Sequence, residues 1–196
     1  MKGDARSTEC LYTDIEWALS QGLPPRDLIP MLQRLIRAAD PGSAYAVYAK
    51  RQLAEYLVER SPFRAARLAT EVLAVQEDDR ALATLGRAHT LLGNFRLAER
   101  AYRDALALTP HCPWYAHELG KLLTLHRAPD QALPFLRLAR RLLPHEPEFA
   151  ATLGLALARA GLRDEAFPHA LEAARGDHGR AGELLDRWQR DVAARG

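Results

Sequence analysis

β-Branched apolar residues, which strands need, are scarce in this chain. Val and Ile together account for only 8 of the 196 residues, whereas Ala, Leu and Arg number 35, 33 and 24. Val and Ile cover the pleated surface of a sheet well, while Ala, Leu and Arg are among the residues most easily held in a helix. The composition therefore excludes a protein built on a sheet, including the doubly wound enzyme folds, and predicts an all-α protein.

Long apolar runs and cysteines are also missing. No window approaches the roughly 20 apolar residues of a transmembrane helix, and residues 1–20 contain no apolar stretch of signal-peptide length. The two cysteines, Cys10 and Cys112, are too few for a disulfide framework. We therefore expect a cytoplasmic protein with two free thiols and no membrane span.

A strong charge of either sign is absent as well. The formal net charge is only +2, and the basic residues are scattered among acidic ones along the whole chain. Nucleic-acid-binding domains usually have a higher isoelectric point and gather Lys and Arg on one face. We therefore expect no nucleic-acid partner, and interpret the arginines as a solvated surface.

Motifs that carry catalysis are missing. The sequence contains no GxGxxG, GxxxxGK[ST], GxSxG or HExxH, and no pair of cysteines with metal-ligand spacing. We interpret the histidines as surface or rim residues; they are His89, His111, His117, His126, His145, His169 and His178. The sequence thus predicts no enzyme: no catalytic residue, no metal site and no cofactor.

What the chain does contain is an internal repeat. Segments 81–110, 115–144 and 149–178 align without a gap, each 34 residues after the one before. The matching positions are Leu85-Gly86, Leu119-Gly120 and Leu153-Gly154 early in each copy, and Ala98, Ala132 and Ala166 later in it. A fixed period of this length is typical of proteins built from stacked structural units.

The pattern within each copy predicts packed helices. Each copy holds two amphipathic stretches of helix length that are joined by a short turn. A glycine inside a helix costs about 1 kcal/mol relative to alanine, which is tolerable where a neighbouring helix approaches too closely for a side chain. We expect Gly86, Gly120 and Gly154 at such contacts, with the three repeated alanines as the small residues opposite them.

These features resemble the tetratricopeptide repeat family, which has a 34-residue period, a Leu-Gly pair in the first helix and small residues in the second. The resemblance implies an all-α, right-handed α-solenoid of stacked antiparallel helix pairs. Residues 79–112, 113–146 and 147–180 carry the repeats most clearly, and 47–78 are a degenerate copy, within a repeat region spanning 43–180. Residues 1–42 are expected to form an N-terminal helical cap or a diverged repeat, and 181–196 a C-terminal capping helix.

In the resembled family, peptides lie in a concave groove lined by the first helix of each repeat. The family's contact positions carried onto this chain give a predicted partner-binding set: Tyr48, Arg51, Arg80, Arg87, Trp114, His117, Lys121 and Leu155. Cations in this set suit carboxylates, and aromatic side chains are frequent interface anchors. For Tyr48, packing against the N-terminal helices is an equally good interpretation; for Trp114 the groove is favoured.

The resemblance implies a non-catalytic protein-interaction module. We expect an adaptor or scaffold, in a bacterial assembly, that binds a peptide or protein segment with acidic and apolar residues. Two alternatives remain open at this point: a cytosolic secretion chaperone for an exported client, and a regulatory or accessory subunit of an enzyme. The Lys and Asn residues with which some relatives clamp a chaperone's C-terminal carboxylate are absent, which disfavours such tails as partners.

Overall fold

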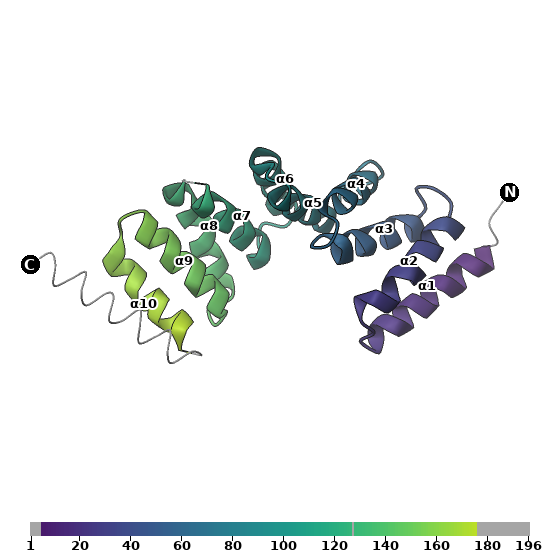
Figure 1. Cartoon of the computed structure of the whole chain (residues 1–196), viewed down its shortest axis with the longest axis horizontal. Helices are drawn as coiled ribbons and strands as arrows, with labels where there is room; N and C mark the ends of the chain where they lie inside the picture. Colours follow the sequence, from purple (N-terminus) through teal and green to yellow (C-terminus); the bar gives the residue numbers. More distant parts are fainter. Residues whose placement is uncertain (1–4, 127, 176–196) are drawn as a thin grey trace, which may run out of the picture. The chain divides into compact units, whose positions relative to one another are not determined.

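The computed structural model describes residues 5–126 and 128–175, and this part of the chain contains ten α-helices and no strand. Consecutive helices form antiparallel hairpins along the chain (Figure 1). The helices are α1 (Ala5–Ser20), α2 (Pro25–Ala38), α3 (Ala44–Leu57), α4 (Pro62–Leu73), α5 (Asp79–Leu91), α6 (Phe95–Leu108), α7 (Pro113–Leu125), α8 (Pro129–Leu142), α9 (Pro147–Arg159) and α10 (Arg163–Ala174).

The chain divides into two compact units, Met1–Leu108 and Thr109–Gly196. In the first unit each helix from α1 to α5 packs on the helix that follows it, and α3 also contacts α5. One apolar cluster of this unit joins α1 to α5, with Ile15 of α1, Leu32 of α2, Leu53 of α3, Leu68 of α4 and Ala88 of α5 all buried. Burial of these side chains is what makes an amphipathic helix stable in water.

The second unit repeats this arrangement with α7 to α10. Helix α7 packs on both α8 and α9, and α9 packs on α10. The buried side chains include Leu119 and Leu123 of α7, Leu136 of α8, and Leu153 and Leu157 of α9. The predicted tandem repeat of helix pairs is therefore confirmed within each unit, and the three clear repeats correspond to α5–α6, α7–α8 and α9–α10.

Local sequence signals explain where the helices begin and end. Five of them, α2, α4, α7, α8 and α9, have proline in their first turn, where the missing N–H is not needed. Gly93 and Gly161 adopt positive φ angles of 75° and 83° in the turns after α5 and α9. Residues with a Cβ rarely adopt that backbone conformation, so these glycines allow the chain to reverse direction.

The repeated glycines lie where two helices of one hairpin approach closely. A Cβ added to Gly120 would lie 2.5 Å from Leu136 Cγ, and one on Gly86 would lie 2.8 Å from the Tyr102 ring. On Gly154 it would meet the Ala170 backbone nitrogen at 3.2 Å. The predicted close approach is confirmed, but the nearest residue follows each glycine by 16 positions.

The expected partner alanines contribute less than the sequence suggested. Ala132 and Ala166 meet their glycines only through backbone oxygens, 3.4 Å from the added Cβ. Ala98 is not among the three atoms nearest Gly86, where the Tyr102 ring fills the space instead. At Gly86 and Gly120 the reason is geometric: the next turn of the second helix carries Tyr102 or Leu136, whose long side chain reaches over the glycine.

Part of each end of the chain lies outside the described residues. The predicted C-terminal capping helix at 181–196 lies outside the described residues. Residues 1–42 contain α1 and α2, which pack on each other, and α2 packs on α3. Among the helices described, none combines the length and the apolar character needed to span a bilayer.

We predict that Gly120→Ala destabilises the second unit. Alanine is favoured over glycine in a helix by about 1 kcal/mol, but its Cβ would collide with Leu136. Overpacking of this kind costs about 1–3 kcal/mol, so the free energy of unfolding, measured by urea denaturation, should fall. In a Leu136→Ala background the same change should cost less, because the colliding atoms are gone; an equal cost in both backgrounds would contradict this placement.

Candidate interaction surface on the first helices

The predicted partner-binding residues all lie on the first helices of their hairpins, but in two separate units. Tyr48 and Arg51 lie on α3, Arg80 and Arg87 on α5, Trp114, His117 and Lys121 on α7, and Leu155 on α9. In each unit, internal packing leaves only some of these side chains available to a partner.

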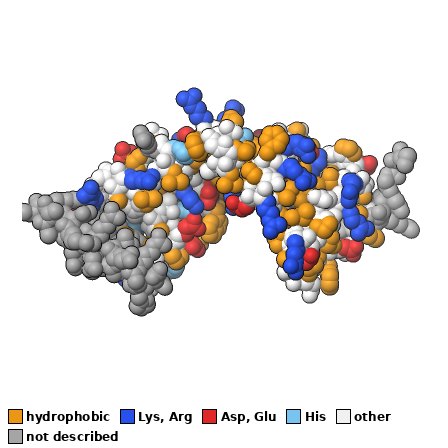
Figure 2. All heavy atoms as spheres, viewed as in Figure 1, with side chains coloured by type: hydrophobic (Ala, Val, Ile, Leu, Met, Phe, Trp, Pro, Cys, Tyr) orange, Lys and Arg blue, Asp and Glu red, His pale blue; other side chains and the backbone are white. Residues whose placement is uncertain are grey.

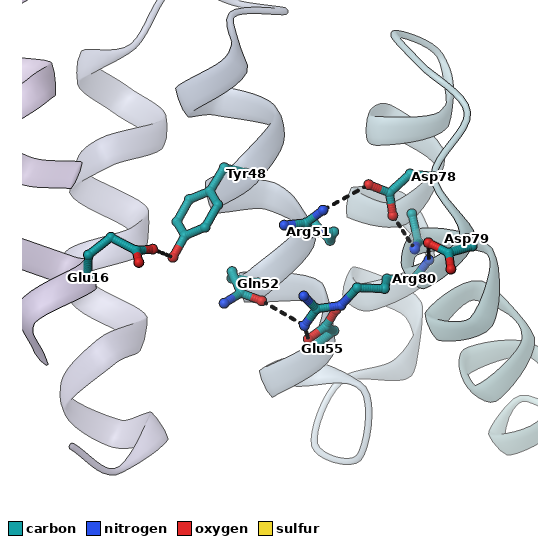
Figure 3. Close-up of polar contacts among 9 residues, drawn as sticks. Glu16, Tyr48, Arg51, Gln52, Glu55, Asp78, Asp79 and Arg80 are labelled. Carbon is teal, nitrogen blue, oxygen red and sulfur yellow. Dashed lines mark hydrogen bonds and ion pairs between the residues drawn. The ribbon is translucent and has the colours of Figure 1, made fainter. Parts of the chain in front are cut away.

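Arg51 is engaged by the residue that caps the next first helix. Its Nη1 lies 3.1 Å from Asp78 Oδ2, while Asp78 Oδ1 accepts a hydrogen bond of 2.8 Å from the Ala81 N–H at the start of α5 (Figure 3). Only 7% of Asp78 is exposed. Arg51 therefore holds a helix cap in place, a structural role that the sequence analysis did not assign to it.

The two arginines of α5 have acidic partners as well. Arg80 Nη2 lies 2.7 Å from Glu55 Oε2 and 3.3 Å from Gln52 Oε1, both on α3 (Figure 3). Arg87 Nη2 pairs with Glu59, just beyond the end of α3. The three predicted cations of α3 and α5 thus each meet a carboxylate from the neighbouring hairpin.

Tyr48 packs against the N-terminal helix, which is one of the two interpretations left open by the sequence. Its ring lies edge-on to Tyr12 of α1 with centroids 5.0 Å apart, and its hydroxyl donates a hydrogen bond to Glu16 (Figure 3). Burial raises the pKa of Tyr48, and the hydrogen bond to the Glu16 carboxylate raises this pKa further. The ring therefore belongs to the contact between α1 and α3.

In the second unit, Lys121 follows the same pairing as the arginines. Its Nζ lies 3.1 Å from Glu148 Oε1 on α9. The four pairs between successive first helices join residues 25 to 28 positions apart. That recurring offset between opposite charges is the sequence signal that could have revealed them. Acidic and basic side chains accordingly lie beside one another on the face shown in Figure 2.

Trp114 and Leu155 remain open to solvent. Trp114 is 47% exposed at the start of α7, with its ring edge-on to Phe149 of α9 at a centroid distance of 4.9 Å. Leu155 is 44% exposed on α9. Of the eight predicted residues, these two present the largest apolar surface that packing within the unit leaves uncovered.

His117 is an interior residue, and the expectation of surface or rim histidines is wrong for it. It is fully buried between α7 and α9, with its ring stacked on Phe149 at 4.4 Å. The Thr152 hydroxyl donates to the Glu148 carbonyl oxygen, so its own oxygen accepts the hydrogen bond of 2.9 Å from His117 Nε2–H. Burial lowers the pKa of His117 to about 4, which keeps the ring neutral.

The histidines and cysteines in the described part of the chain do not assemble into a metal centre. Within 5–126 and 128–175, no group of three or more His, Cys, Asp or Glu side chains is placed to hold a metal ion. In the loop before α7, His111 is exposed and Cys112 is a half-buried free thiol. His117 is buried between α7 and α9.

Several solved structures share this arrangement of helices. A crystal structure of MamA is 19% identical, with a TM-score of 0.71, and covers 91% of this chain and 96% of its own. Residues 41 to the end of MamA from Desulfovibrio magneticus RS-1 are 17% identical with a TM-score of 0.73, covering 91% and 99%. YrrB, described as a TPR protein with an unusual peptide-binding site, is 17% identical with a TM-score of 0.68, covering 88% of each chain.

No protein-family model matches the chain, and neither does any curated protein. The likeness in structure nevertheless identifies the class of fold, an array of helix hairpins. Together with the 34-residue repeat, it shows that the chain has the tetratricopeptide repeat fold, as the sequence resemblance predicted.

We predict that Asp78 stabilises the first unit mainly as a helix cap. Asp78→Asn keeps an oxygen that can accept from the Ala81 N–H, whereas Asp78→Ala removes it. Loss of such a cap costs about 1 kcal/mol, so Asp78→Ala should unfold at lower urea concentration than Asp78→Asn. Equal unfolding midpoints for the two variants, both below that of the original chain, would show that the ion pair with Arg51, not the cap, carries the contribution.

We also predict that His117 makes stability fall in mild acid. The unfolded chain protonates this histidine near pH 6.5, but the fold does so only near pH 4. Between these values the unfolded state binds more protons at this residue, so the contribution of His117 to the free energy of unfolding should drop by about 3 kcal/mol as pH falls from 6.5 to 4, then level off. Urea denaturation at several pH values measures this.

The matched variants are His117→Gln, which removes the buried titrating group, and His111→Gln, which removes an exposed one. The first should reduce the pH dependence by the contribution of His117, while His89 and His169, whose pKa values burial also lowers, keep theirs. The second should leave the pH dependence as in the original chain. If His117→Gln keeps the full slope, the buried histidine is not its source.

Proposed function

We propose that the chain is a non-catalytic adaptor or scaffold that holds a segment of another protein on the exposed side of α7 and α9. The observation that carries this proposal is the exposure of Trp114 and Leu155, two large apolar side chains on adjoining first helices. Aromatic and aliphatic side chains of this kind are common anchors of interfaces.

Two further observations support the proposal. The predicted residues of α3 and α5 already have partners within their unit, so they offer fewer free groups than α7 and α9. In addition, the structurally similar YrrB is described as having a peptide-binding site. A protein with this fold can therefore bind a peptide. Recognition of a polypeptide needs neither a cofactor nor a metal.

The proposal is tested by capturing partners on the immobilised full chain and measuring the affinity of each purified partner by calorimetry. Leu155→Glu places a charge on the proposed surface and should raise the Kd about tenfold or more, the loss of a good interface anchor. The matched control is Leu97→Glu on α6, because Leu97 is 51% exposed and undergoes the same chemical change.

The control should bind partners as the original chain does, and both variants should unfold at similar temperatures. If Leu155→Glu binds every purified partner with unchanged Kd, the exposed side of α7 and α9 is not the binding surface.

A further inference from the structure

The exposed residues of α7 and α9 form two neighbouring stripes, which we call the α7–α9 surface. On α7 the stripe runs through Trp114, Lys121 and Leu125, and on α9 through Glu148, Ala151, Leu155 and Ala158. Residues spaced by three, four or seven positions share one side of a helix. The ion pair between Lys121 and Glu148 joins the stripes, so both lie on the same side of the helix pair.

Helix α9 is apolar on both of its sides. Its inner side buries Phe149, Leu153 and Leu157, while its outer side exposes Leu155 between two alanines. Single exposed apolar residues are ordinary on protein surfaces. On α9 three apolar residues, Ala151, Leu155 and Ala158, form an exposed stripe over two helical turns. A helix that is apolar on all sides is typically covered by other elements on all sides.

The charged side chains of α7 and α9 balance, because Glu118 and Glu148 stand against Lys121 and Arg159. Lys121 Nζ is paired with Glu148, and Arg159 Nη1 donates to the Thr124 carbonyl oxygen at 2.8 Å. An acidic segment would have to compete with Glu148 for Lys121, and a basic segment would have to compete with Lys121 for Glu148. Neither finds a net charge of opposite sign on these two helices, so electrostatics favours a partner of low net charge.

We infer that the α7–α9 surface binds a polypeptide segment with apolar side chains and little net charge, and not the acidic segment that the arginines suggest. This inference rests on the proposed function. The small side chains of Ala151 and Ala158 let a partner's larger apolar side chain approach the α9 backbone on either side of Leu155. The segment's own amide groups can hydrogen-bond to the Lys121–Glu148 pair, which pure hydrocarbon could not.

The test uses a phage-displayed library of random peptides of about 12 residues, selected on the immobilised full chain. Enriched sequences are synthesised and titrated by calorimetry against the original chain, Leu155→Glu and the control Leu97→Glu. We expect peptides with at least two large apolar residues and a net charge close to zero. Their Kd should rise about tenfold with Leu155→Glu, stay within about twofold with Leu97→Glu, and change little between about 50 and 500 mM NaCl.

Several results would overturn the inference. Enrichment of acidic peptides whose binding weakens strongly with salt would leave the proposed function standing and contradict only the partner's chemistry. Apolar peptides that bind Leu155→Glu as well as the original chain would place the site elsewhere. No enrichment above a blank surface would contradict the proposed function together with the inference.

Two further measurements separate the other possible occupants, and either of the following results would also overturn the inference. If light scattering shows that Leu155→Glu turns a dimer of the original chain into a monomer, a second copy of the chain is the occupant. If Leu155→Glu, but not Leu97→Glu, lowers the unfolding temperature markedly while no peptide binds, the surface is covered from within the chain.

Discussion

The close approach of the two helices in the hairpins α5–α6, α7–α8 and α9–α10 is the constraint on which the rest of this structure depends. At Gly86 and Gly120 the second helix comes so near that a single added carbon would collide with Tyr102 or Leu136. Tight packing of this kind leaves few voids and fixes the relative position of two helices. With each hairpin set in this way, the residues on the first helices are placed by the repeat itself.

Pairing between successive hairpins is largely electrostatic at the surface. Arg51, Arg80 and Arg87 meet carboxylates of the adjacent hairpin, and Lys121 does the same in the second unit. Exposed pairs contribute little to stability one at a time. Their larger effect is on recognition, because a cation that already has a carboxylate neighbour gives an incoming acidic chain little additional attraction.

The sequence predicted the fold well and the availability of the site poorly. The 34-residue period and the repeated glycines predicted paired helices, and the structure shows that local signals such as Pro113 and Gly161 mark where helices begin and end. The ion pairs were not predicted from the sequence because each joins residues on different hairpins. The residue pattern of one helix does not show which residues of the next hairpin lie beside it. The burial of His117 was not predicted for the same reason. The equivalent residues in the other repeats are Ala83 and Ala151, and His117 is buried by contacts with Phe149 and Thr152 of α9.

One position of the repeat shows how such a protein can change its binding chemistry while keeping its fold. Arg87, Lys121 and Leu155 stand 34 residues apart at equivalent places on α5, α7 and α9. Arg87 pairs with Glu59 and Lys121 with Glu148, whereas Leu155 is a large apolar side chain left in solvent. The glycine that precedes each of these residues faces the second helix of its own hairpin, about 100° away around the first helix. Exchanging a cation for leucine therefore leaves the glycine contact in place. Selection can therefore alter the outer face of one hairpin independently, which turns a charged, self-paired surface into an apolar one.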